Sequence, residues 1–504
     1  MKILIADDEK MVRISLKSML MDMNLPLEIV GEAKNGEEFV NMLETFTPDI
    51  AFVDIKMPKL NGLEAIKIGK TVSPHTQWVI LTGFSQFDYA QEAIRLGASN
   101  YLLKPVSPEE LEETLKILIK QNKEYQITLN KKFERDIISL YYDIDFIQEK
   151  DAEHIILKSK LMGAVFCIDS SLNENCKAER QRKFFYALRS IIDSLLVNDI
   201  KIALFNLSNG DLATVCAWNF IQENECKQLI NSYFEKVVHL VNQLNDSQFS
   251  ITVLQTDEFS HYKSFYEQLY QIQKLAPLRV MLGIGIKWTI QDLILNEKDP
   301  AKLRLSTLLI NLCEYYNENM YLHYGKVLKE LKSLMLDFKC INNSKVKKAI
   351  SGFLFCSMNC KLEINQDMNS WINTLDKYGE HLLVQNKTEK ISQPDLVSQV
   401  ISFIDQNYMY DIGIGPIAEK LNITPNYLSS LFHKKTGMKF IDYLTEVRIL
   451  NAKKMLTDNP QMQVKQVAKE VGYYSTRHFT KVFVKFVGCY PSEYQKNFNN
   501  KRAE

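Results

Sequence analysis

The stretch IAFVDIKMP, residues 50–58, decides the fold of the N-terminal part of this 504-residue chain. The apolar run Ile50 to Val53 predicts a strand that is buried on both faces, and Met57-Pro58 ends the extended segment. Such strands lie at the centre of parallel sheets, whose carboxyl ends carry the chemistry of open α/β folds. Asp54 is therefore expected at a strand tip. An Asp there is more often a loop residue or a helix cap than a reacting group, so its role depends on the neighbouring segments.

Strands and helices alternate on both sides of this stretch, which predicts a doubly wound, flavodoxin-like α/β sheet over residues 1–122. Further strands are expected at Lys2–Ala6, Glu28–Ala33, Gln77–Thr82 and Asn100–Lys104. Helices are expected from about Val12 to Leu20, Gly36 to Thr45, Leu63 to Ile68 and Phe87 to Leu96, and again after Ser107-Pro108.

Five polar residues follow the strands of this predicted sheet: Asp7, Asp8, Asp54, Thr82 and Lys104. The carboxyl ends of parallel strands meet at one edge, so we expect these side chains to converge. Three carboxylates at close range repel each other unless a hard cation lies among them, and Mg2+ prefers such oxygen ligands. With the lysine and the hydroxyl added, the set suits phosphoryl transfer onto Asp54.

Residues 1–122 resemble the receiver domain of two-component response regulators. The matching segments are IADDE at 5–9, VDIKMPKLNGLE at 53–64, LTG at 81–83 and YLLKP at 101–105. The resemblance implies that a sensor histidine kinase phosphorylates Asp54, and that Thr82 and Lys104 contact the phosphoryl oxygens. It also implies a cis peptide before Pro105, and a switch in which Thr82 moves toward the phosphoryl group and Tyr101 turns inward behind it.

The same resemblance implies a magnesium site. Asp8, Asp54 and the backbone carbonyl of Lys56 are its expected ligands, and Asp7 is expected to act through water. The Mg2+ ion is the cofactor that the sequence predicts.

The middle of the chain carries weaker signals. Residues 123–160 predict a helical linker, in which Ile137, Leu140, Tyr141 and Ile144 suit either core packing or pairing with a second copy. Residues 161–290 predict an α/β domain with strands at 164–168, 201–207, 212–218, 249–254 and 279–286, and Asn209-Gly210-Asp211 as a hairpin turn. The order of elements faintly resembles the GGDEF and nucleotidyl-cyclase fold, but the turn lacks the residues that two-metal nucleotide chemistry needs. A degenerate sensing or dimerising domain is the expectation.

Residues 291–394 predict a helical region that ends in a polar linker. It contains no glycine-rich phosphate loop, no HExxH motif and no nucleophile elbow. Cys356 and Cys360 lie four residues apart in a helical pattern, which indicates core thiols rather than half of a zinc site.

Two helix-turn-helix patterns occur within residues 395–504. The first places a helix at Gly415–Leu421 before TPNYLSSLFHKKTG, and the second places one at Val464–Val471 before STRHFTKVFVKFVG. A long helix from about Phe440 to Leu456 joins them, with Ile441, Leu444, Val447 and Leu450 on the face expected to be buried. A duplicated motif of this kind suits two successive major-groove segments on one face of DNA.

This segment resembles the DNA-binding domain of the AraC/XylS family, and its combination with a receiver is like the YesN-type response regulators. The resemblance implies these base-reading positions: Asn426, Ser429, Ser430 and His433 in the first recognition helix, and Thr476, Arg477, Thr480 and Lys481 in the second. Arg477 suits guanine, whereas Lys434, Lys481 and Lys485 suit phosphates.

Charge is divided unevenly along the chain, although its 61 basic and 61 acidic residues cancel. Residues 1–124 have a net charge of −5 (14 − 19) and residues 395–504 have +5 (15 − 10), which favours a polyanion as partner of the basic end. The nine cysteines follow no disulfide spacing and no apolar run approaches about 20 residues, so a reducing cytoplasm and no membrane are expected.

The sequence thus predicts a phosphorylation-controlled transcriptional regulator and not an enzyme. Its expected partners are a histidine kinase and double-stranded promoter DNA, with RNA polymerase as a further candidate and a homodimer as the active form. Two alternatives remain open at this point: a receiver-controlled enzyme that makes a nucleotide second messenger, and a regulator whose middle region senses an effector.

Overall fold

The computed structural model describes residues 1–83, 97–142, 156, 159–196, 200–219, 223–318, 320–337, 343–385, 396–459 and 461–496. The chain divides into two compact units, Met1–Thr128 and Leu129–Glu504. Among the described residues, no helix has the length and apolar character needed to cross a membrane.

The first unit is built on a parallel five-stranded sheet in the order β2-β1-β3-β4-β5. Its elements are β1 (Lys2–Ala6), α1 (Lys10–Asp22), β2 (Glu28–Ala33), α2 (Gly36–Phe46), β3 (Ile50–Asp54), α3 (Gly62–Val72), β4 (Gln77–Thr82), β5 (Asn100–Leu103) and α5 (Pro108–Tyr141), whose last part belongs to the second unit. The predicted flavodoxin-like sheet is confirmed. The helix predicted near Phe87 lies outside the described residues.

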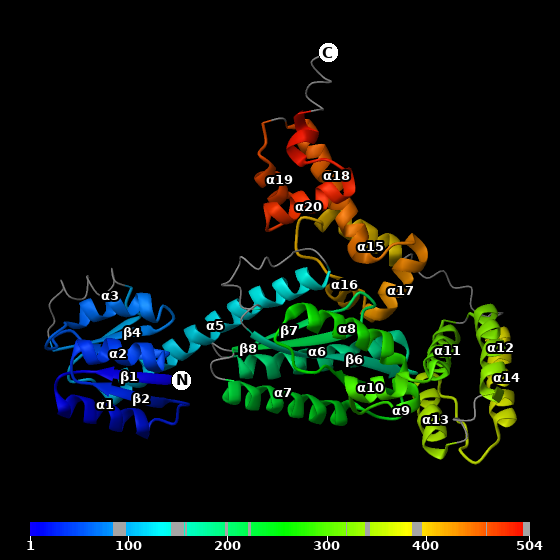
Figure 1. Cartoon of the computed structure of the whole chain (residues 1–504), viewed down its shortest axis with the longest axis horizontal. Coiled ribbons are helices and arrows are strands. Elements are labelled where there is room, and N and C mark those ends of the chain that lie inside the picture. The colour runs from blue at the N-terminus through cyan, green and yellow to red at the C-terminus, as the bar shows by residue number, and fades with distance from the viewer. Residues whose placement is uncertain are drawn as a thin grey trace. The chain divides into compact units, whose positions relative to one another are not determined.

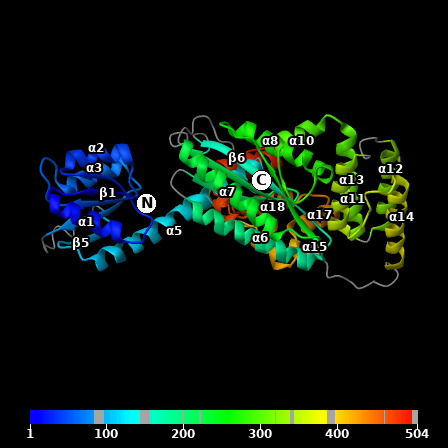
Figure 2. The same ribbon diagram turned by 90° about the horizontal axis from the view of Figure 1, so that it is seen from below.

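Helices cover both faces of this sheet (Figures 1 and 2). Leu16 and Leu20 of α1 and Leu111 and Leu115 of α5 pack on one face, and α2 and α3 pack on the other. All five residues of β3 are buried, as expected of a central parallel strand. This double cover holds the carboxyl end of β3, and hence Asp54, in a fixed place.

The second unit begins with a second five-stranded sheet, in the order β10-β9-β6-β8-β7. Its elements are β6 (Ser159–Ser170), α6 (Glu174–Leu195), β7 (Ile200–Asn206), β8 (Leu212–Asn219), α7 (Glu223–Leu244), β9 (Phe249–Gln255), α8 (Tyr262–Leu275), η2 (Ala276–Leu278), α9 (Arg279–Leu282), β10 (Lys287–Thr289) and α10 (Ile290–Glu297). The strands are antiparallel to their neighbours except β10, which runs parallel to β9. The predicted turn 209–211 joins β7 to β8, and Gly210 has a positive φ of 91°. The resemblance to the cyclase fold stays a prediction.

One predicted strand in this sheet is wrong. Residues 279–286 were expected to be extended, but Arg279–Leu282 forms a short helix and the strand starts only at Lys287. The helix turns the guanidinium of Arg279 toward Asp169, with Nη2 2.7 Å from Oδ1 and Nε 3.0 Å from Oδ2. Both side chains are buried, so this ion pair stabilises the helical conformation that the apolar pattern of the segment did not predict.

The C-terminal part of α5 packs against this sheet. Phe133, Ile137 and Leu140 are buried in a core with residues of β6, β7, β8 and α8. Asn130 joins the edge strand β7, because its Nδ2 donates to the carbonyl of Ile202 at 2.8 Å and its Oδ1 accepts from the amide of Ile202 at 2.7 Å. Of the two roles left open for this helix, core packing is the one observed for Ile137 and Leu140.

Four helices follow the sheet, α11 (Pro300–Asn317), α12 (Tyr321–Asp337), α13 (Ser344–Met358) and α14 (Met368–Gln385), as predicted for a helical region (Figure 1). Their apolar faces form a separate core around Trp371 and Tyr324. Cys356 and Cys360 are buried free thiols, and Cys356 Sγ lies 3.2 Å from the carbonyl oxygen of Asp169.

The C-terminal helices are α15 (Leu396–Asn407), α16 (Ile414–Lys420), α17 (Pro425–Thr436), α18 (Phe440–Asp458), α19 (Val464–Glu470) and α20 (Thr476–Val487). Both helix-turn-helix patterns are confirmed. Thr424 caps α17 by accepting from the amide of Tyr427, and Ser475 caps α20 by accepting from that of His478. Gly437 and Gly488 end these helices in the left-handed conformation.

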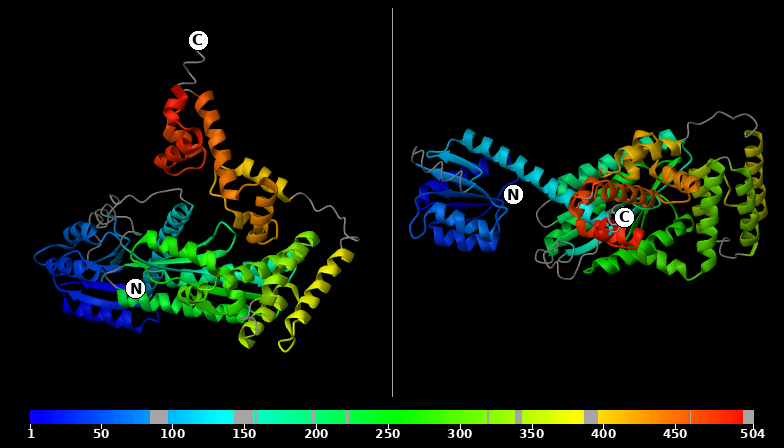
Figure 3. Two further views of the ribbon diagram at one scale, coloured as in Figure 1. Left: turned by 45° about the vertical axis from the view of Figure 1, so that its right-hand side comes forward. Right: turned by 90° about the horizontal axis from the view of Figure 1, so that it is seen from above.

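The helix α18 serves two separate cores, one for each helix-turn-helix, which appear as an orange and a red group in Figure 3. Its start, at Leu444, packs into the first core, and Ile449 and Ala452 pack into the second. The expectation that Leu450 is buried is wrong, because its side chain is 66% exposed. A single buried stripe was assumed, whereas a helix shared by two cores changes its buried face along its length.

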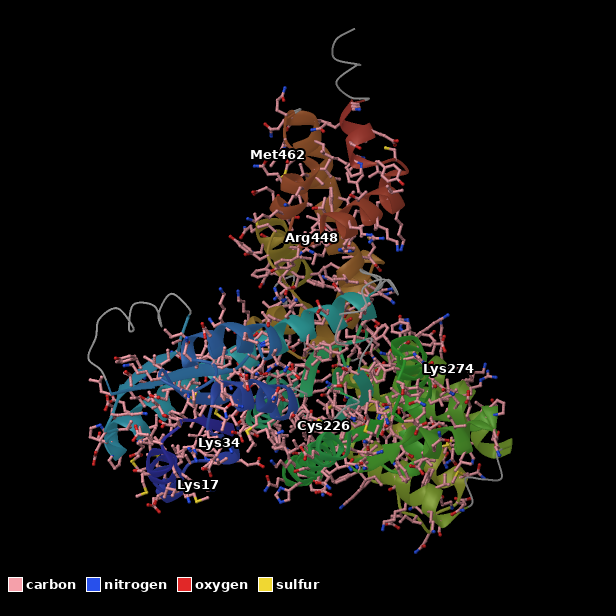
Figure 4. All side chains as sticks on the ribbon, turned by 60° about the vertical axis from the view of Figure 1, so that its left-hand side comes forward. Lys17, Lys34, Cys226, Lys274, Arg448 and Met462 are labelled. Atoms are coloured by element: carbon pink, nitrogen blue, oxygen red, sulfur yellow. The ribbon has the colours of Figure 1, made fainter. Side chains whose placement is uncertain are left out.

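Arg448, near the middle of α18 (Figure 4), fixes the junction between these cores. Its Nε donates to the carbonyl of Tyr408 at 2.7 Å and its Nη2 to that of Tyr410 at 2.8 Å. Its guanidinium also lies over the Tyr473 ring, with the guanidinium carbon 5.4 Å from the ring centroid.

Acid is expected to destabilise the second helix-turn-helix through His478. This side chain is buried, and burial together with the charges of Arg448 and Lys481 lowers its pKa from 6.5 to about 4. The unfolded chain therefore binds the proton more readily, and stability is lost as the pH falls from about 6.5 toward 4, by roughly 3 kcal/mol.

Hydrogen exchange of the α20 amides as a function of pH measures this loss. A His478→Gln variant should lack that part of the pH dependence, and His433→Gln, which changes an exposed side chain, should keep it. An unaltered acid dependence in His478→Gln would contradict the assignment.

Candidate functional site

Asp54 ends the central strand of the first sheet. Its side chain is only 8% exposed. The strand can turn sharply into the following loop because Gly62 lies against it, and a Cβ atom at position 62 would collide with the backbone oxygen of Asp54. The amide of Gly62 donates to the carbonyl of Ile55 at 2.9 Å. Local backbone packing therefore holds the carboxylate at the edge of the sheet.

Lys104 joins two carboxylates at this edge. Its Nζ lies 2.6 Å from Asp7 Oδ2 and 2.8 Å from Asp54 Oδ1. A hydrogen bond to the neighbouring strand holds its backbone, because the amide of Lys104 donates to the carbonyl of Thr82 at 2.7 Å. The peptide bond to Pro105 is cis, as the resemblance implied.

The electrostatics of this cluster favour a charged lysine. Burial raises the pKa of the Asp54 carboxyl, and the hydrogen bond and charge of Lys104 oppose that rise. Burial alone would lower the pKa of Lys104, but its hydrogen bonds and ion pairs with Asp54 and Asp7 raise it instead. Lys104 therefore keeps its positive charge beside Asp54.

A cavity of about 200 Å³ opens in front of Asp54. It is lined by Asp8, Glu9, Asp54, Ile55, Lys56, Thr82, Gly83 and Lys104. Most of the residues predicted for phosphoryl transfer thus line one space, although they span about a hundred positions of the sequence. The exceptions are Asp7, which is fully buried and reaches the site through Lys104, and Tyr101, which lies half-buried on β5 opposite Ile80.

The residues at this edge fit a hard divalent cation. Carboxylate oxygens of Asp7, Asp8 and Glu9 can lie within 4.8 Å of one another, and such oxygens are the ligands that Mg2+ prefers. Glu9 was not among the residues predicted, although it continues the acidic run from Asp7. Its amide donates to Asp7 Oδ1 at 2.9 Å, and Glu9 lines the cavity.

The two recognition helices differ in their surroundings. On α20, Arg477, Lys481 and Lys485 are exposed, and Thr476 and Thr480 are half-buried. On α17, Ser430, His433 and Lys434 are exposed. Asn426 and Ser429 are half-buried because they contact the β7–β8 turn.

Both ends of the chain match known families. A model of the response regulator receiver domain matches residues 3–116, and a model of a helix-turn-helix domain matches residues 417–497. The chemotaxis protein CheY of Thermotoga maritima is 34% identical over 114 residues, which are 23% of this chain and 93% of CheY. The chain belongs to the response regulators.

A second relative resembles this response regulator over its whole length. The uncharacterized transcriptional regulatory protein YesN of Bacillus subtilis is 21% identical over 496 residues, 98% of this chain and 97% of YesN. Other curated relatives match about a quarter of the chain, and the match spans about half of their own length. Among solved structures, the REC domain of AraT, a response regulator from Geobacillus stearothermophilus, is 37% identical over 25% of this chain and 97% of that domain, with a TM-score of 0.23.

Proposed function

We propose that this response regulator receives a phosphoryl group on Asp54 from a sensor histidine kinase, and that this modification changes how tightly its two helix-turn-helix motifs bind double-stranded promoter DNA. The observation that carries the proposal is the cavity in front of Asp54, in which the Lys104 ammonium lies 2.8 Å from the accepting carboxylate.

The residues have separate roles in the proposed transfer. A carboxylate oxygen of Asp54 forms the new bond to phosphorus while the bond to the donor nitrogen breaks, so the histidine leaves and negative charge collects on the phosphoryl oxygens. Lys104 offsets that charge, and the Thr82 hydroxyl at the end of β4 donates to a phosphoryl oxygen.

A bound Mg2+ ion would neutralise further charge on the transferred group. We propose that it is held by Asp8, Asp54 and the backbone carbonyl of Lys56, with Asp7 acting through water. Glu9 adds an exposed carboxylate at the same edge.

The C-terminal helices supply the proposed DNA interface. Arg477 and Lys481 project from the first turns of α20 and are exposed, as base and phosphate contacts require. The net charge of +5 over residues 395–504 favours a polyanion. A homodimer as the active form, and RNA polymerase as a further partner, belong to the same proposal.

The proposal is tested by the retention of genomic DNA fragments on the full chain, with and without acetyl phosphate. Fragments that are enriched, and enriched differently in the two arms, support it. A chain that is phosphorylated and retains DNA identically in both arms contradicts it.

Arg477→Ala tests the assignment of α20 as a reader of bases. Loss of one arginine contact to a base should weaken binding to a selected fragment by about 1–3 kcal/mol and relax the preference at one position. Lys485→Ala is the control, since a lost phosphate contact should weaken all duplexes alike. Binding curves for the selected fragment and a random duplex separate the two cases, and an equal loss on both duplexes for Arg477→Ala would contradict its role.

A further inference from the structure

The first recognition helix contacts the β7–β8 turn through two of its proposed base-reading residues. Asn426 Nδ2 donates to Asp211 Oδ1 at 2.6 Å, and Ser429 Oγ donates to the carbonyl oxygen of Ser208 at 3.1 Å. The approach is close, because a Cβ atom at Gly210 would lie 2.5 Å from the Cα of Asn426. In this arrangement neither side chain is available to a base edge.

Acidic groups reach the same helix from other elements. Thr424, the N-cap of α17, donates its hydroxyl to Glu174 Oε2 at 2.9 Å, and Glu174 is the first residue of α6. Near the other end of α17, Lys434 Nζ lies 3.4 Å from Glu318 Oε2. Glu174, Asp211 and Glu318 are far apart in the sequence, and all three meet the one helix.

These three carboxylates occupy positions that suit DNA. The N-terminus of a helix and a lysine on the same helix are common phosphate contacts, as Thr424 and Lys434 could be here. An asparagine in the first turn, such as Asn426, is a common contact to a base edge. At each position the structure has a protein carboxylate as the acceptor. The contact therefore pairs α17 with anionic oxygens of the kind that a duplex would present.

The contact borders a large cavity and includes further polar pairs. A cavity of about 790 Å³ lies beside it, lined by residues of both domains that include Arg182, Tyr186, Ile414 and Leu444. Two further polar contacts border it, between the Tyr186 hydroxyl and Glu419 at 2.7 Å and between Arg182 and Asn422 at 3.1 Å. Among the described residues, the buried apolar clusters of the sheet domain and of the first helix-turn-helix are separate, so the contact can open without exposing either hydrophobic core.

We propose that the middle region inhibits DNA binding by masking α17, with Glu174 and Asp211 of the sheet domain and Glu318 at the end of α11 taking the place of the anionic groups of DNA. This inference rests on the proposed function, because it requires α17 to contact DNA. It adds a device that neither terminal domain contains by itself: the middle region competes with the duplex for the first recognition helix. Opening of the contact then exposes Asn426 and Ser429.

Gly210→Ala in the full chain tests the masking. The added methyl group collides with the backbone of Asn426, so the contact should open, and affinity for a random-sequence duplex without any phosphoryl donor should rise roughly tenfold, within the usual range of allosteric coupling. Gly283→Ala is the matched control. It also places a side chain at a positive φ in the same domain, 120° against 91° at Gly210, but no atom lies within 4 Å of the new methyl group, so affinity should not change.

Glu174→Ala provides a second variant without backbone strain. Loss of its carboxylate should also raise the affinity, whereas Glu179→Ala, which removes an acidic group on the same helix paired only locally with Lys183, should not. Wild-type affinity in both Gly210→Ala and Glu174→Ala would overturn the masking and leave the proposed function intact. Failure of the wild type and of every variant to bind any duplex, with or without acetyl phosphate, would overturn both.

Discussion

An Asp54→Ala variant is expected to bind genomic DNA fragments equally well with and without acetyl phosphate, while the wild type responds to the phosphoryl donor. The reason is that alanine has no oxygen to accept the phosphoryl group, and Thr82 and Lys104 cannot replace it at the end of β3. Folding should be preserved, because Lys104 keeps its ion pair with Asp7 at 2.6 Å and the substitution removes a carboxylate whose burial is unfavourable.

Phosphate-affinity electrophoresis and DNA-binding curves measure the two halves of this prediction. Glu64→Ala is a suitable control, since Glu64 is an exposed acidic residue in the first turn of α3 and does not line the cavity. It should still be phosphorylated and still respond. An Asp54→Ala protein that keeps the full response to acetyl phosphate would contradict the assignment of the acceptor.

Arg279→Met should destabilise the middle sheet domain by about 3–5 kcal/mol, because it leaves the buried Asp169 carboxylate without its partner. The two side chains are only 8% and 6% exposed and share two hydrogen bonds, and Arg279 also donates to the carbonyl of Ala276 at 3.0 Å. Methionine fills much of the space but supplies no charge.

Hydrogen exchange of the β6 and β9 amides at increasing urea concentration follows this domain separately, which matters since a multidomain chain does not unfold in one step. The control is Arg304→Met, which breaks the ion pair with Glu330 between two exposed side chains and should cost only about 0–1 kcal/mol. An equal loss of unfolding free energy in the two variants would show that the buried Arg279–Asp169 ion pair stabilises the domain no more than an exposed one.

Sequence patterns were reliable where local chemistry sets the structure. The strand before Asp54 is apolar at every position because both of its faces are covered, and the caps Thr424, Ser475, Gly437 and Gly488 mark helix ends through their own hydrogen bonds and backbone angles. These signals act within a few residues, so they can be read without knowledge of the rest of the chain.

The predictions that failed depended on distant partners. The segment from Arg279 is helical although its pattern is strand-like, and its guanidinium binds Asp169, which lies 110 positions earlier and stabilises this conformation. Leu450 is exposed because α18 turns its buried face from one core to another. Neither the ion pair nor the change of core can be predicted from the pattern of the neighbouring residues.

The sequence by itself determined the two ends of this protein: a strand that delivers Asp54 to a sheet edge, and two capped helix-turn-helix motifs. Only the tertiary structure decided which surfaces of the middle region contact α17, the helix proposed to read DNA. Asn426 and Asp211 are 215 residues apart and hydrogen-bond at 2.6 Å, a contact that depends on how two separately folded cores meet. Hydrophobic periodicity and capping specify each core, but they carry no information about the polar surfaces through which the cores touch.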